Sequence, residues 1–225
     1  MSNLVVKSLL GLLFLLLCLA LALFLAAGTL RFWQAWLYLA VFFLCTLLIT
    51  IYLINYDQRL LASRVQAGPT AETQTAQQVI QSLASLLFIG LFVVPGLDFR
   101  FHWSTVPVLI SLVADSLVAL SFWIVFLVFR ENSYTSAVIE VASEQTVIIS
   151  GPYRLVRHPM YAGASLLLIF TPIALGSWVA LPLALLLIVV IALRAREEEK
   201  FLVANLPGYA EYRQQVRYRL IPFIW

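Results

Sequence analysis

The stretch "PMYAGASLLLIFTPIALGSWVALPLALLLIVVIALR", residues 159–194, decides how this chain folds. It is apolar for most of its length, and it is much longer than the ~20 residues that one helix needs to cross a hydrocarbon core. Pro172 and Gly176 interrupt it near the middle, and such residues are typical of a turn. We therefore expect a helical hairpin that enters the membrane and returns to the side from which it came.

Four further apolar stretches precede this hairpin, at residues 9–28, 33–54, 79–95 and 106–129. Each is long enough to cross a bilayer as a helix, the conformation in which a backbone satisfies its own hydrogen bonds in lipid. The first exceeds the apolar region of a signal peptide, so we read it as an uncleaved anchor. The sequence predicts an all-α multi-pass membrane protein with four transmembrane helices plus a C-terminal helical hairpin.

The composition leads to the same class of protein. The chain is 63% hydrophobic and only 11% charged, whereas a soluble domain carries about 25% charged residues. No basic run with interleaved aromatic residues is present, so we expect no nucleic-acid partner. Cys18 and Cys45 lie inside apolar stretches and follow no metal-ligand spacing, so no metal is expected.

Lysine and arginine are distributed unevenly between the two sides of the expected helices. If the N-terminus is cytoplasmic, the opposite side holds only Arg31 and Arg100. An excess of positive charge marks the cytoplasmic side, so we expect both termini there, in the inner membrane of a bacterium, a source that the compactness of the chain suggests. The basic residues of that side are Lys7, Arg59, Arg64, Arg130, Arg154, Arg157, Arg194, Arg196, Lys200, Arg213, Arg217 and Arg219.

Three polar segments connect or follow the apolar ones. Residues 55–78 form a cytoplasmic connector, and "AVIEVASEQTVIIS", residues 137–150, has a short polar sequence between two β-branched runs. That pattern predicts a short β-hairpin-like loop against the membrane. The tail, residues 195–225, is amphipathic and charged. We expect it to continue the hairpin's second helix and to form another short helix after Pro207-Gly208.

The segment that opens the hairpin, "GPYRLVRHPMYAG" at residues 151–163, is unusually rich in polar groups. His158 precedes Pro159, which predicts that His158 caps a helix beginning at Pro159. The first-turn N–H groups near Met160 and Tyr161 then lack helical partners and favour an anion. Gly163 allows another backbone or a ligand to approach the first turn closely.

A second polar cluster, "RAREEEKF" at residues 194–201, follows the hairpin. Successive helical residues point in different directions, so the three glutamates do not all face one pocket. Glu198 lies four residues after Arg194, the spacing of a helical ion pair, and we expect Glu197 on a solvated face. Because the hairpin returns to its starting side, the glutamates and "RHP" meet at one depth.

These motifs together resemble the isoprenylcysteine carboxyl methyltransferase family. The resemblance rests on "REN" at residues 130–132, "GPYRLVRHPMYAG", the hairpin, the acidic pair and "PGYAEYRQQVRYRLIP". "QAGPTAE" and "VVPGLDFRF" in the N-terminal half match bacterial members more loosely. Members are integral-membrane enzymes that use S-adenosylmethionine, and they are related to phospholipid N-methyltransferases. The resemblance implies a cofactor-binding methyltransferase core at 130–225, after N-terminal transmembrane helices at 1–129.

The resemblance also implies which residues enclose the cofactor. The acidic pair maps best onto Glu198-Glu199, because Glu197-Glu198 would change the distance to Tyr209 and Tyr212. Aromatic rings would stack on the adenine or face the sulfonium, and carboxylates would accept hydrogen bonds from the ribose or the ammonium. The implied cofactor-binding residues are Tyr153, His158, Pro159, Tyr161, Gly163, Glu198, Glu199, Tyr209 and Tyr212.

The implied reaction moves a methyl group from S-adenosylmethionine to a lipophilic small molecule or lipidated acceptor, foremost a carboxylate of the isoprenylcysteine type. A carboxylate is already ionised at pH 7 and needs alignment rather than a base. Arg157, Asn132 and Arg213 are the candidates for orienting it. The acceptor would enter laterally from the membrane lipids, at the boundary between membrane and cytoplasm.

Three alternatives stay open. A phospholipid amine would be a different acceptor and would require a base, for which Glu198 or His158 are candidates. Sterol-type reductases that use NADPH carry a similar "RHPNYxGE" signature, but Met160 and Ala164 depart from it here. In the third alternative, the segment only anchors a non-enzymatic scaffold in the membrane. Asp115, inside the fourth apolar stretch, is either functional or hydrogen-bonded to Ser111 or to a neighbouring helix.

Overall fold

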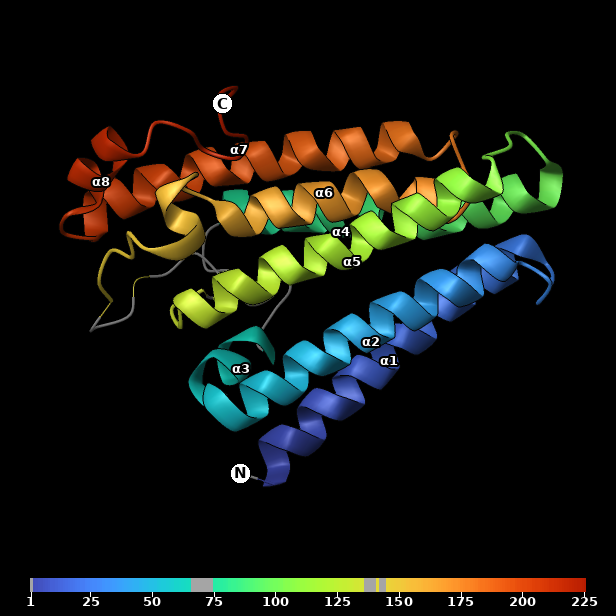
Figure 1. Ribbon diagram of the computed structural model, residues 1–225, viewed down its shortest axis with the longest axis horizontal. Coiled ribbons are helices and arrows are strands. Elements are labelled where there is room, and N and C mark those ends of the chain that lie inside the picture. Colours follow the sequence, from blue (N-terminus) through green and yellow to red (C-terminus); the bar gives the residue numbers. More distant parts are fainter. Residues whose placement is uncertain (1, 66–74, 136–140, 142–144) are drawn as a thin grey trace.

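The computed structural model describes residues 2–65, 75–135, 141 and 145–225, and it is helical wherever it has regular structure. This confirms the predicted all-α architecture (Figure 1). The long helices are α1 (Ser2–Ala27), α2 (Trp33–Tyr56), α4 (Thr75–Phe101), α5 (Val108–Glu131), α6 (Pro159–Ala174) and α7 (Leu181–Asn205). The short elements are α3 (Gln58–Val65), η2 (Gly151–Arg154) and α8 (Tyr209–Gln215).

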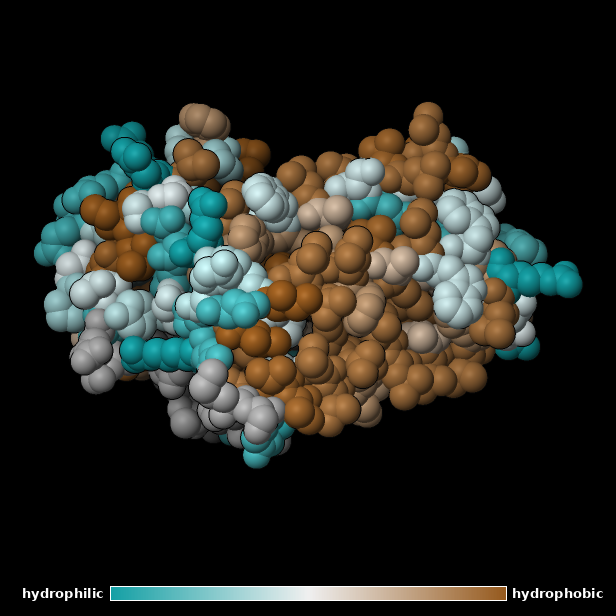
Figure 2. Space-filling model, turned by 60° about the horizontal axis from the view of Figure 1, so that its bottom comes forward, coloured by the Kyte–Doolittle hydropathy of each residue, from teal (hydrophilic) through white to brown (hydrophobic). Residues whose placement is uncertain are grey.

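Four of the long helices, α1, α2, α4 and α5, are long and apolar enough to cross a membrane. They correspond to the four predicted stretches: α1 and α4 begin several residues earlier than predicted, and the bounds of α2 and α5 agree within two residues. Large apolar side chains such as Phe14, Leu25 and Leu109 are exposed on their outer faces. Figure 2 shows the result as a broad hydrophobic surface beside a more hydrophilic end. The protein is an integral multi-pass membrane protein.

The predicted helical hairpin is confirmed as α6 and α7, which lie side by side (Figure 1). Pro172 does not form the turn, because α6 continues past it to Ala174. The chain reverses at Gly176, whose φ of 76° is in the left-handed region that glycine adopts most readily. Pro182 then lies in the first turn of α7, where a missing N–H costs nothing.

A buried aspartate ties this turn to α4. Asp98 accepts hydrogen bonds from the backbone N–H and the hydroxyl of Ser104, at 2.7 and 2.6 Å, and from the hydroxyl of Ser177, at 2.5 Å. The hydroxyl of Ser104 also accepts a hydrogen bond from the Trp178 N–H. These contacts hold together the loop after α4 and the loop between α6 and α7.

The apolar core lies between the long helices. It includes Leu23 of α1, Tyr38 of α2, Phe92 of α4 and Val118 of α5, all almost completely buried. The crossing of α1 and α4 is very close, because a Cβ atom at Gly96 would lie 2.6 Å from the carbonyl oxygen of Leu23. Only glycine permits this approach.

A few polar groups are buried among the spans. The hydroxyls of Tyr38 and Thr171 are hydrogen-bonded at 3.0 Å, joining α2 to α6. Asp115 is buried, and its carboxylate has no hydrogen-bond partner among the residues that the structure describes. Ser111, one partner considered for it, instead donates to the carbonyl of Ile173 on α6 at 3.2 Å. The α5–α6 contact therefore uses the Ser111 hydroxyl.

The polar elements gather at the end of the bundle opposite the α6–α7 turn. This end holds α3, the end of α5, η2, the start of α6, the end of α7 and α8, with both termini on the same side of the molecule (Figure 1). The two predicted tail helices are confirmed, as α7 continues to Asn205 and α8 follows Pro207-Gly208. Half of the β-hairpin-like loop predicted at 137–150 falls outside the described residues, and residues 141 and 145–150 form no strand.

Candidate functional site

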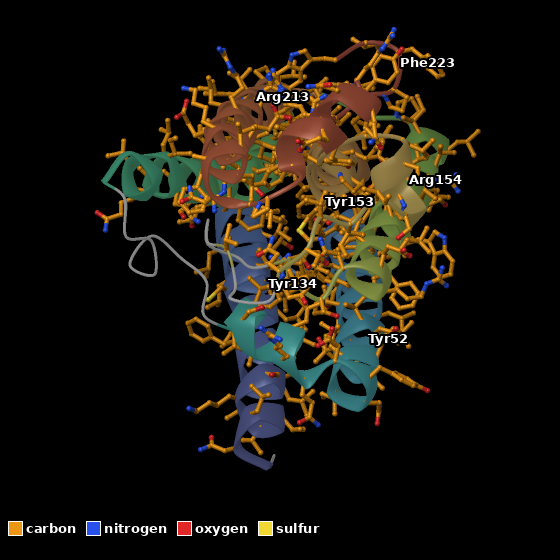
Figure 3. The ribbon with its side chains drawn as sticks, turned by 90° about the vertical axis from the view of Figure 1, so that its left-hand side faces the viewer. Tyr52, Tyr134, Tyr153, Arg154, Arg213 and Phe223 are labelled. Carbon is orange, nitrogen blue, oxygen red and sulfur yellow. The ribbon has the colours of Figure 1, made fainter. Side chains whose placement is uncertain are left out.

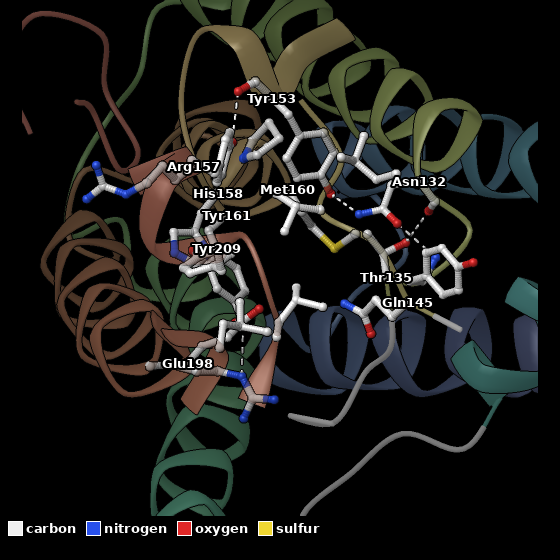
Figure 4. Close-up of a pocket in the computed structure, with 18 of the residues that line it drawn as sticks. Asn132, Thr135, Gln145, Tyr153, Arg157, His158, Met160, Tyr161, Glu198 and Tyr209 are labelled. Carbon is white, nitrogen blue, oxygen red and sulfur yellow. Dashed lines mark hydrogen bonds between the residues drawn. The ribbon is translucent and has the colours of Figure 1, made fainter. Parts of the chain in front are cut away.

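A cavity of about 400 Å³ opens at this polar end, within the size range of small-molecule sites. Its wall comes from α3, α4, the end of α5, η2, α6, α7 and α8, so segments far apart in the sequence meet around it (Figure 4). Nine of the twelve predicted site residues line the cavity: Asn132, Tyr153, Arg157, His158, Pro159, Tyr161, Glu198, Tyr209 and Tyr212.

The start of α6 has the predicted construction. His158 is the N-cap, and Pro159 is the first helical residue. The Ala162 N–H bonds back to the His158 carbonyl, so the N–H groups of Met160 and Tyr161 are the first-turn donors without a helical acceptor. Together with the positive end of the helix dipole, they form an anion-binding edge on the cavity.

Two buried polar atoms in the cavity wall lack a hydrogen-bond partner among the described residues. They are Nε2 of His158 and the hydroxyl of Tyr209. Buried polar atoms are almost always hydrogen-bonded, so these two are suited to a polar ligand. The ring of His158 is stacked on that of Tyr161, with 5.5 Å between centroids, and this contact orients the imidazole.

Glu198 lines the cavity, and hydrogen bonds involving Tyr161 and Arg194 hold its carboxylate in place. The Tyr161 hydroxyl donates to Oε2 of Glu198 at 2.6 Å, and it accepts from Nε of Arg194 at 3.1 Å. The predicted association of Glu198 with Arg194 therefore includes a tyrosine hydroxyl between them. A carboxylate held in this way is fixed in position and still has further lone pairs for a ligand.

On the other side of the cavity, three residues fix one another. Nδ2 of Asn132 donates to the hydroxyl of Tyr153 at 2.8 Å, and the hydroxyl of Tyr212 donates to the Tyr153 carbonyl at 2.8 Å. Burial raises the pKa of Tyr153 and of Tyr212. Both phenols are thus neutral at physiological pH, and both are held with defined ring orientations.

Behind the cavity wall, Glu199 forms a buried ionic cluster. Its Oε1 accepts from Nε of Arg157 at 2.6 Å, and its Oε2 accepts from Nε of Arg219 at 2.8 Å. Nε2 of His158 lies 3.4 Å from Oε1, outside hydrogen-bond geometry. Only 2% of the Glu199 side chain is exposed, so the two arginines are what makes a charge at this depth tolerable.

The charge state of Glu199 follows from these neighbours. Burial raises the pKa of the Glu199 carboxyl, but His158 and the hydrogen bonds from Arg157 and Arg219 outweigh burial and lower the pKa to about 2. Glu199 is therefore a permanent anion at neutral pH. Glu199 does not line the cavity, and the guanidinium groups of Arg157 and Arg219 balance its negative charge.

The same cluster holds the tail segment 216–219 against the start of α6. Nη1 of Arg157 donates to the carbonyls of Val216 and Arg217, both at 2.7 Å. The backbone N–H groups of Arg157 and His158 donate to the carbonyls of Tyr218 and Arg219, both at 2.9 Å. The guanidinium of Arg157 turns away from the centre of the cavity (Figure 4). Arg157 thus connects the tail to the start of α6.

Besides Glu199, two of the predicted site residues lie outside the cavity wall, Gly163 and Arg213. Gly163 faces α5, where a Cβ would lie 3.2 Å from side-chain carbons of Ile124 and Val125, so it permits helix packing rather than ligand approach. Arg213 is exposed and does not line the cavity. Seen from the polar end, it lies toward the edge of the molecule (Figure 3). Glu197, which was predicted to be solvated, is exposed to solvent and pairs with Lys200.

Several residues of the cavity wall were missed by sequence reasoning. They come from α3, α4 and the segments 134–135 and 145–148, which lie outside the motifs. In the sequence, Arg64 indicated only which side of the membrane faces the cytoplasm. The polar residues of the "ASEQ" region indicated only a turn between two β-branched runs. The missed polar residues in the wall are Arg64, Gln81, Tyr134, Thr135, Gln145 and Thr146.

Comparison with known families bears on this part of the chain. Residues 109–207 match the family model of the phospholipid methyltransferases. No curated protein matches the chain. The matched residues, less than half of the chain, run from α5 to the end of α7 and include the start of α6 and Glu198. Methyltransferases of this family use S-adenosylmethionine, and residues 109–207 are similar to them.

Proposed function

We propose that the protein transfers a methyl group from S-adenosylmethionine to the carboxylate of a lipophilic acceptor, of the isoprenylcysteine type, at the cytoplasmic face of the membrane. The observation that carries the proposal is the meeting of the α6 N-terminus, the Nε2 atom of His158 and the Glu198 carboxylate at one cavity. Apolar spans end at the level of this cavity, which suits an acceptor with a lipid tail.

The residues present fit this cofactor. Its carboxylate matches the N–H groups of Met160 and Tyr161 at the start of α6. Its ammonium or ribose hydroxyls match the carboxylate of Glu198, which Tyr161 holds in place. The partnerless polar atoms of His158 and Tyr209 supply further hydrogen-bonding groups beside tyrosine rings. When bound, S-adenosylmethionine supplies a methyl group on a positively charged sulfur.

The contribution of the protein is alignment and exclusion of water. Tyr153, Asn132 and Tyr212 fix one wall through mutual hydrogen bonds, and the Arg157–Glu199 pair holds the tail against the start of α6. Holding two reactants in line accounts for roughly 7–11 kcal/mol of a barrier. No proton has to be removed from a carboxylate acceptor at neutral pH, so this reaction asks for no general base.

A phospholipid amine is the second candidate acceptor, favoured by the family that matches residues 109–207. An amine is protonated at neutral pH and has to lose a proton before it attacks. Glu198 is the only carboxylate among the described residues of the cavity wall, and it is the candidate base for this reaction. Its Oε2 already accepts the hydrogen bond of the Tyr161 hydroxyl at 2.6 Å, whereas a carboxylate acceptor asks for no base at all, and we therefore place the carboxylate acceptor first.

The test begins with calorimetric titration of the detergent-purified protein with S-adenosylmethionine, and with NADPH in parallel. Saturable binding of the first, lost in His158→Ala, supports the proposal, whereas binding of NADPH alone would move the protein to the reductases. Transfer of a labelled methyl group to N-acetyl-S-farnesylcysteine or to phosphatidylethanolamine then separates the acceptors. A methyl ester is released by alkali as methanol, and an N-methyl group is not.

A further inference from the structure

A groove separate from the cavity lies between α2 and α5, in the part of the bundle that crosses the membrane. Its volume is about 290 Å³, and it shares no described lining residue with the cavity. The helices α2 and α5 pack against each other (Figure 1). None of the described residues that line the groove is charged. Its wall includes Cys45, Ile49 and Tyr52 of α2 and Ala119, Phe122 and Phe126 of α5, and we call it the α2–α5 groove.

Aromatic rings give the α2–α5 groove a defined shape. The side chain of Phe122 is buried and meets Phe42 of α2 edge to face, with 5.2 Å between the centroids. Tyr52 meets Phe126 in the same way at 4.9 Å, so these two rings join α2 to α5. Edge-to-face contacts of this kind hold rings in fixed orientations. Ala119 contributes only a methyl group to the wall, so a larger side chain there would take up space in the groove.

A cluster of apolar side chains joins the groove to the cavity. Ile49 and Tyr52 line the groove and pack against the buried cluster that contains Phe129. Met160 lines the cavity and packs against the same cluster. An apolar tail that leaves the cavity past Met160 therefore has apolar side chains beside it on the way to the groove.

The groove lies deeper in the membrane than the cavity. Asn132 of the cavity wall is the C-cap of α5. With a rise of about 1.5 Å per residue, Phe126 lies roughly 9 Å and Ala119 roughly 20 Å from Asn132 along the helix. A molecule with its head group in the cavity and its tail along α5 thus places that tail in the groove.

The size of the groove limits what it can hold. A cavity of about 150 Å³ binds benzene, so in proportion the groove of about 290 Å³ accommodates roughly a dozen carbon atoms. This is close to one farnesyl tail and far less than the two acyl chains of a phospholipid. The size of the groove therefore favours an acceptor with a single tail.

We propose that the α2–α5 groove binds the prenyl tail of the acceptor, and that its far end at Ala119 sets the longest tail that fits. This inference rests on the proposed function, which places the carboxylate of the acceptor in the cavity. Lipid is as apolar as the groove, so burial of apolar surface alone gives little preference for the groove over the bilayer. The preference comes from shape, through close contact between the tail and the fixed aromatic rings. Because α2 lies outside the matched residues 109–207, the tail site includes a part of the chain beyond that match.

The first experiment fills the far end of the groove and measures the effect on tails of two lengths. N-acetyl-S-farnesylcysteine and N-acetyl-S-geranylcysteine are titrated into the detergent-purified protein at one detergent concentration. In Ala119→Phe, the affinity for the farnesyl probe should fall about tenfold or more, because overpacking a filled site is unfavourable. The geranyl tail is one isoprene unit shorter and should lose less than about twofold. The affinity for S-adenosylmethionine should stay within about twofold.

Leu120→Phe is the matched control. Leu120 follows Ala119 in α5, is 45% exposed and does not line the groove. The variant therefore adds an aromatic ring at the same depth but outside the groove. It should bind both prenyl probes as the wild type does.

A second experiment locates the tail in the wild type and so does not depend on the folding of any variant. A farnesylcysteine probe with a diazirine at the end of its tail is irradiated with the purified protein, and the adducts are mapped by mass spectrometry. We expect adducts in α2 and α5 at residues of the groove, foremost between Ala119 and Phe126. An excess of N-acetyl-S-farnesylcysteine should prevent them, and an excess of phosphatidylethanolamine should not.

Three results would overturn the inference. Adducts only outside α2 and α5, as expected if a second copy of the chain covered the groove, would place the tail elsewhere. Labelling that phosphatidylethanolamine prevents equally well would make the groove a site for ordinary membrane lipid. An unchanged affinity of Ala119→Phe for the farnesyl probe would show that the tail does not reach Ala119.

Failure of the proposed function looks different from failure of this inference. In that case the wild type binds no S-adenosylmethionine and transfers no methyl group to N-acetyl-S-farnesylcysteine. The labelling experiment still decides whether the groove holds the prenyl tail, because it requires neither the cofactor nor turnover.

Discussion

Nε of Arg157 lies 2.6 Å from Oε1 of Glu199, although 42 residues separate the two in sequence. The pair joins the segment before α6 to the cytoplasmic extension proposed for α7, and it closes the open end of the helical hairpin. Because Arg157 also holds the carbonyls of Val216 and Arg217, one ionic contact fixes three segments around the cavity. We infer a positioning role for both residues.

Replacing Glu198 by glutamine should weaken the binding of S-adenosylmethionine at least about tenfold, because a charged hydrogen-bond acceptor is lost from the cavity wall. Glu197→Gln is the matched control, since Glu197 is the preceding residue, is solvated and pairs with Lys200. It should bind the cofactor as the wild type does. Calorimetric titration measures the affinity of both variants for S-adenosylmethionine. Equal affinities would show that Glu198 does not contact the cofactor.

The stability of the protein should fall in acid as Glu199 becomes protonated. Its pKa of about 2 in the folded protein lies below the ordinary glutamate value of 4.5. Its contribution, roughly 3 kcal/mol by linkage, is therefore complete above about pH 4.5 and is lost as the pH falls from there toward 2. Glu199→Gln should be less stable at pH 7, and its stability should change less between pH 4.5 and 3. Unfolding of the detergent-solubilised proteins checks this, and parallel pH profiles would contradict it.

Gly96→Ala should destabilise the contact between α1 and α4 by about 1–3 kcal/mol, because the added methyl group overlaps the Leu23 carbonyl and the Ala26 side chain. Gly11→Ala is the control within α1, where nothing lies within 4 Å of a Cβ. It should be neutral or stabilising by up to about 1 kcal/mol. Thermal unfolding in detergent compares the two, and an unchanged midpoint for Gly96→Ala would disprove the close crossing.

The orientation predicted from the positive charges is tested by labelling introduced cysteines with a membrane-impermeant maleimide. In a variant without Cys18 and Cys45, we expect cysteines at positions 3 and 222 to react from the cytoplasmic side. His102→Cys, in the loop after α4, should react only from the opposite side. Labelling of position 3 or 222 from outside intact cells would reverse the topology.

Much of the fold was predictable because lipid imposes a simple rule on sequence. Apolar runs of about 20 residues become spanning helices, and the interruption between Pro172 and Gly176 divided the last run into the hairpin that the structure contains. The exact position of the hairpin turn was not predicted, because Pro172 lies inside α6 and the chain reverses only at Gly176. The boundary at residue 129 between the N-terminal helices and the methyltransferase core stays a prediction, as does the β-hairpin-like loop at 137–150.

The candidate site was predictable where local rules apply. His158 before Pro159 marks a helix start, and the return of the hairpin brings Glu198 to the same end. Sequence did not indicate that Glu199 faces the protein interior while Glu198 faces the cavity, because side-chain direction depends on how α7 is rotated against its neighbours. For the same reason the position of Arg64 was not foreseen, since only the packing of α3 places it.

The tie of Asp98 to Ser104 and Ser177 has a mechanical consequence for the whole bundle. It anchors the turn of the α6–α7 hairpin to α4 at the end of the molecule farthest from the cavity. From Leu181 to Arg194, α7 rises roughly 20 Å, so a small tilt about this anchor would produce its largest displacement at the cavity mouth. The turn is thus the fixed end of the hairpin, and the cavity end is the part that any tilt of the hairpin would move most.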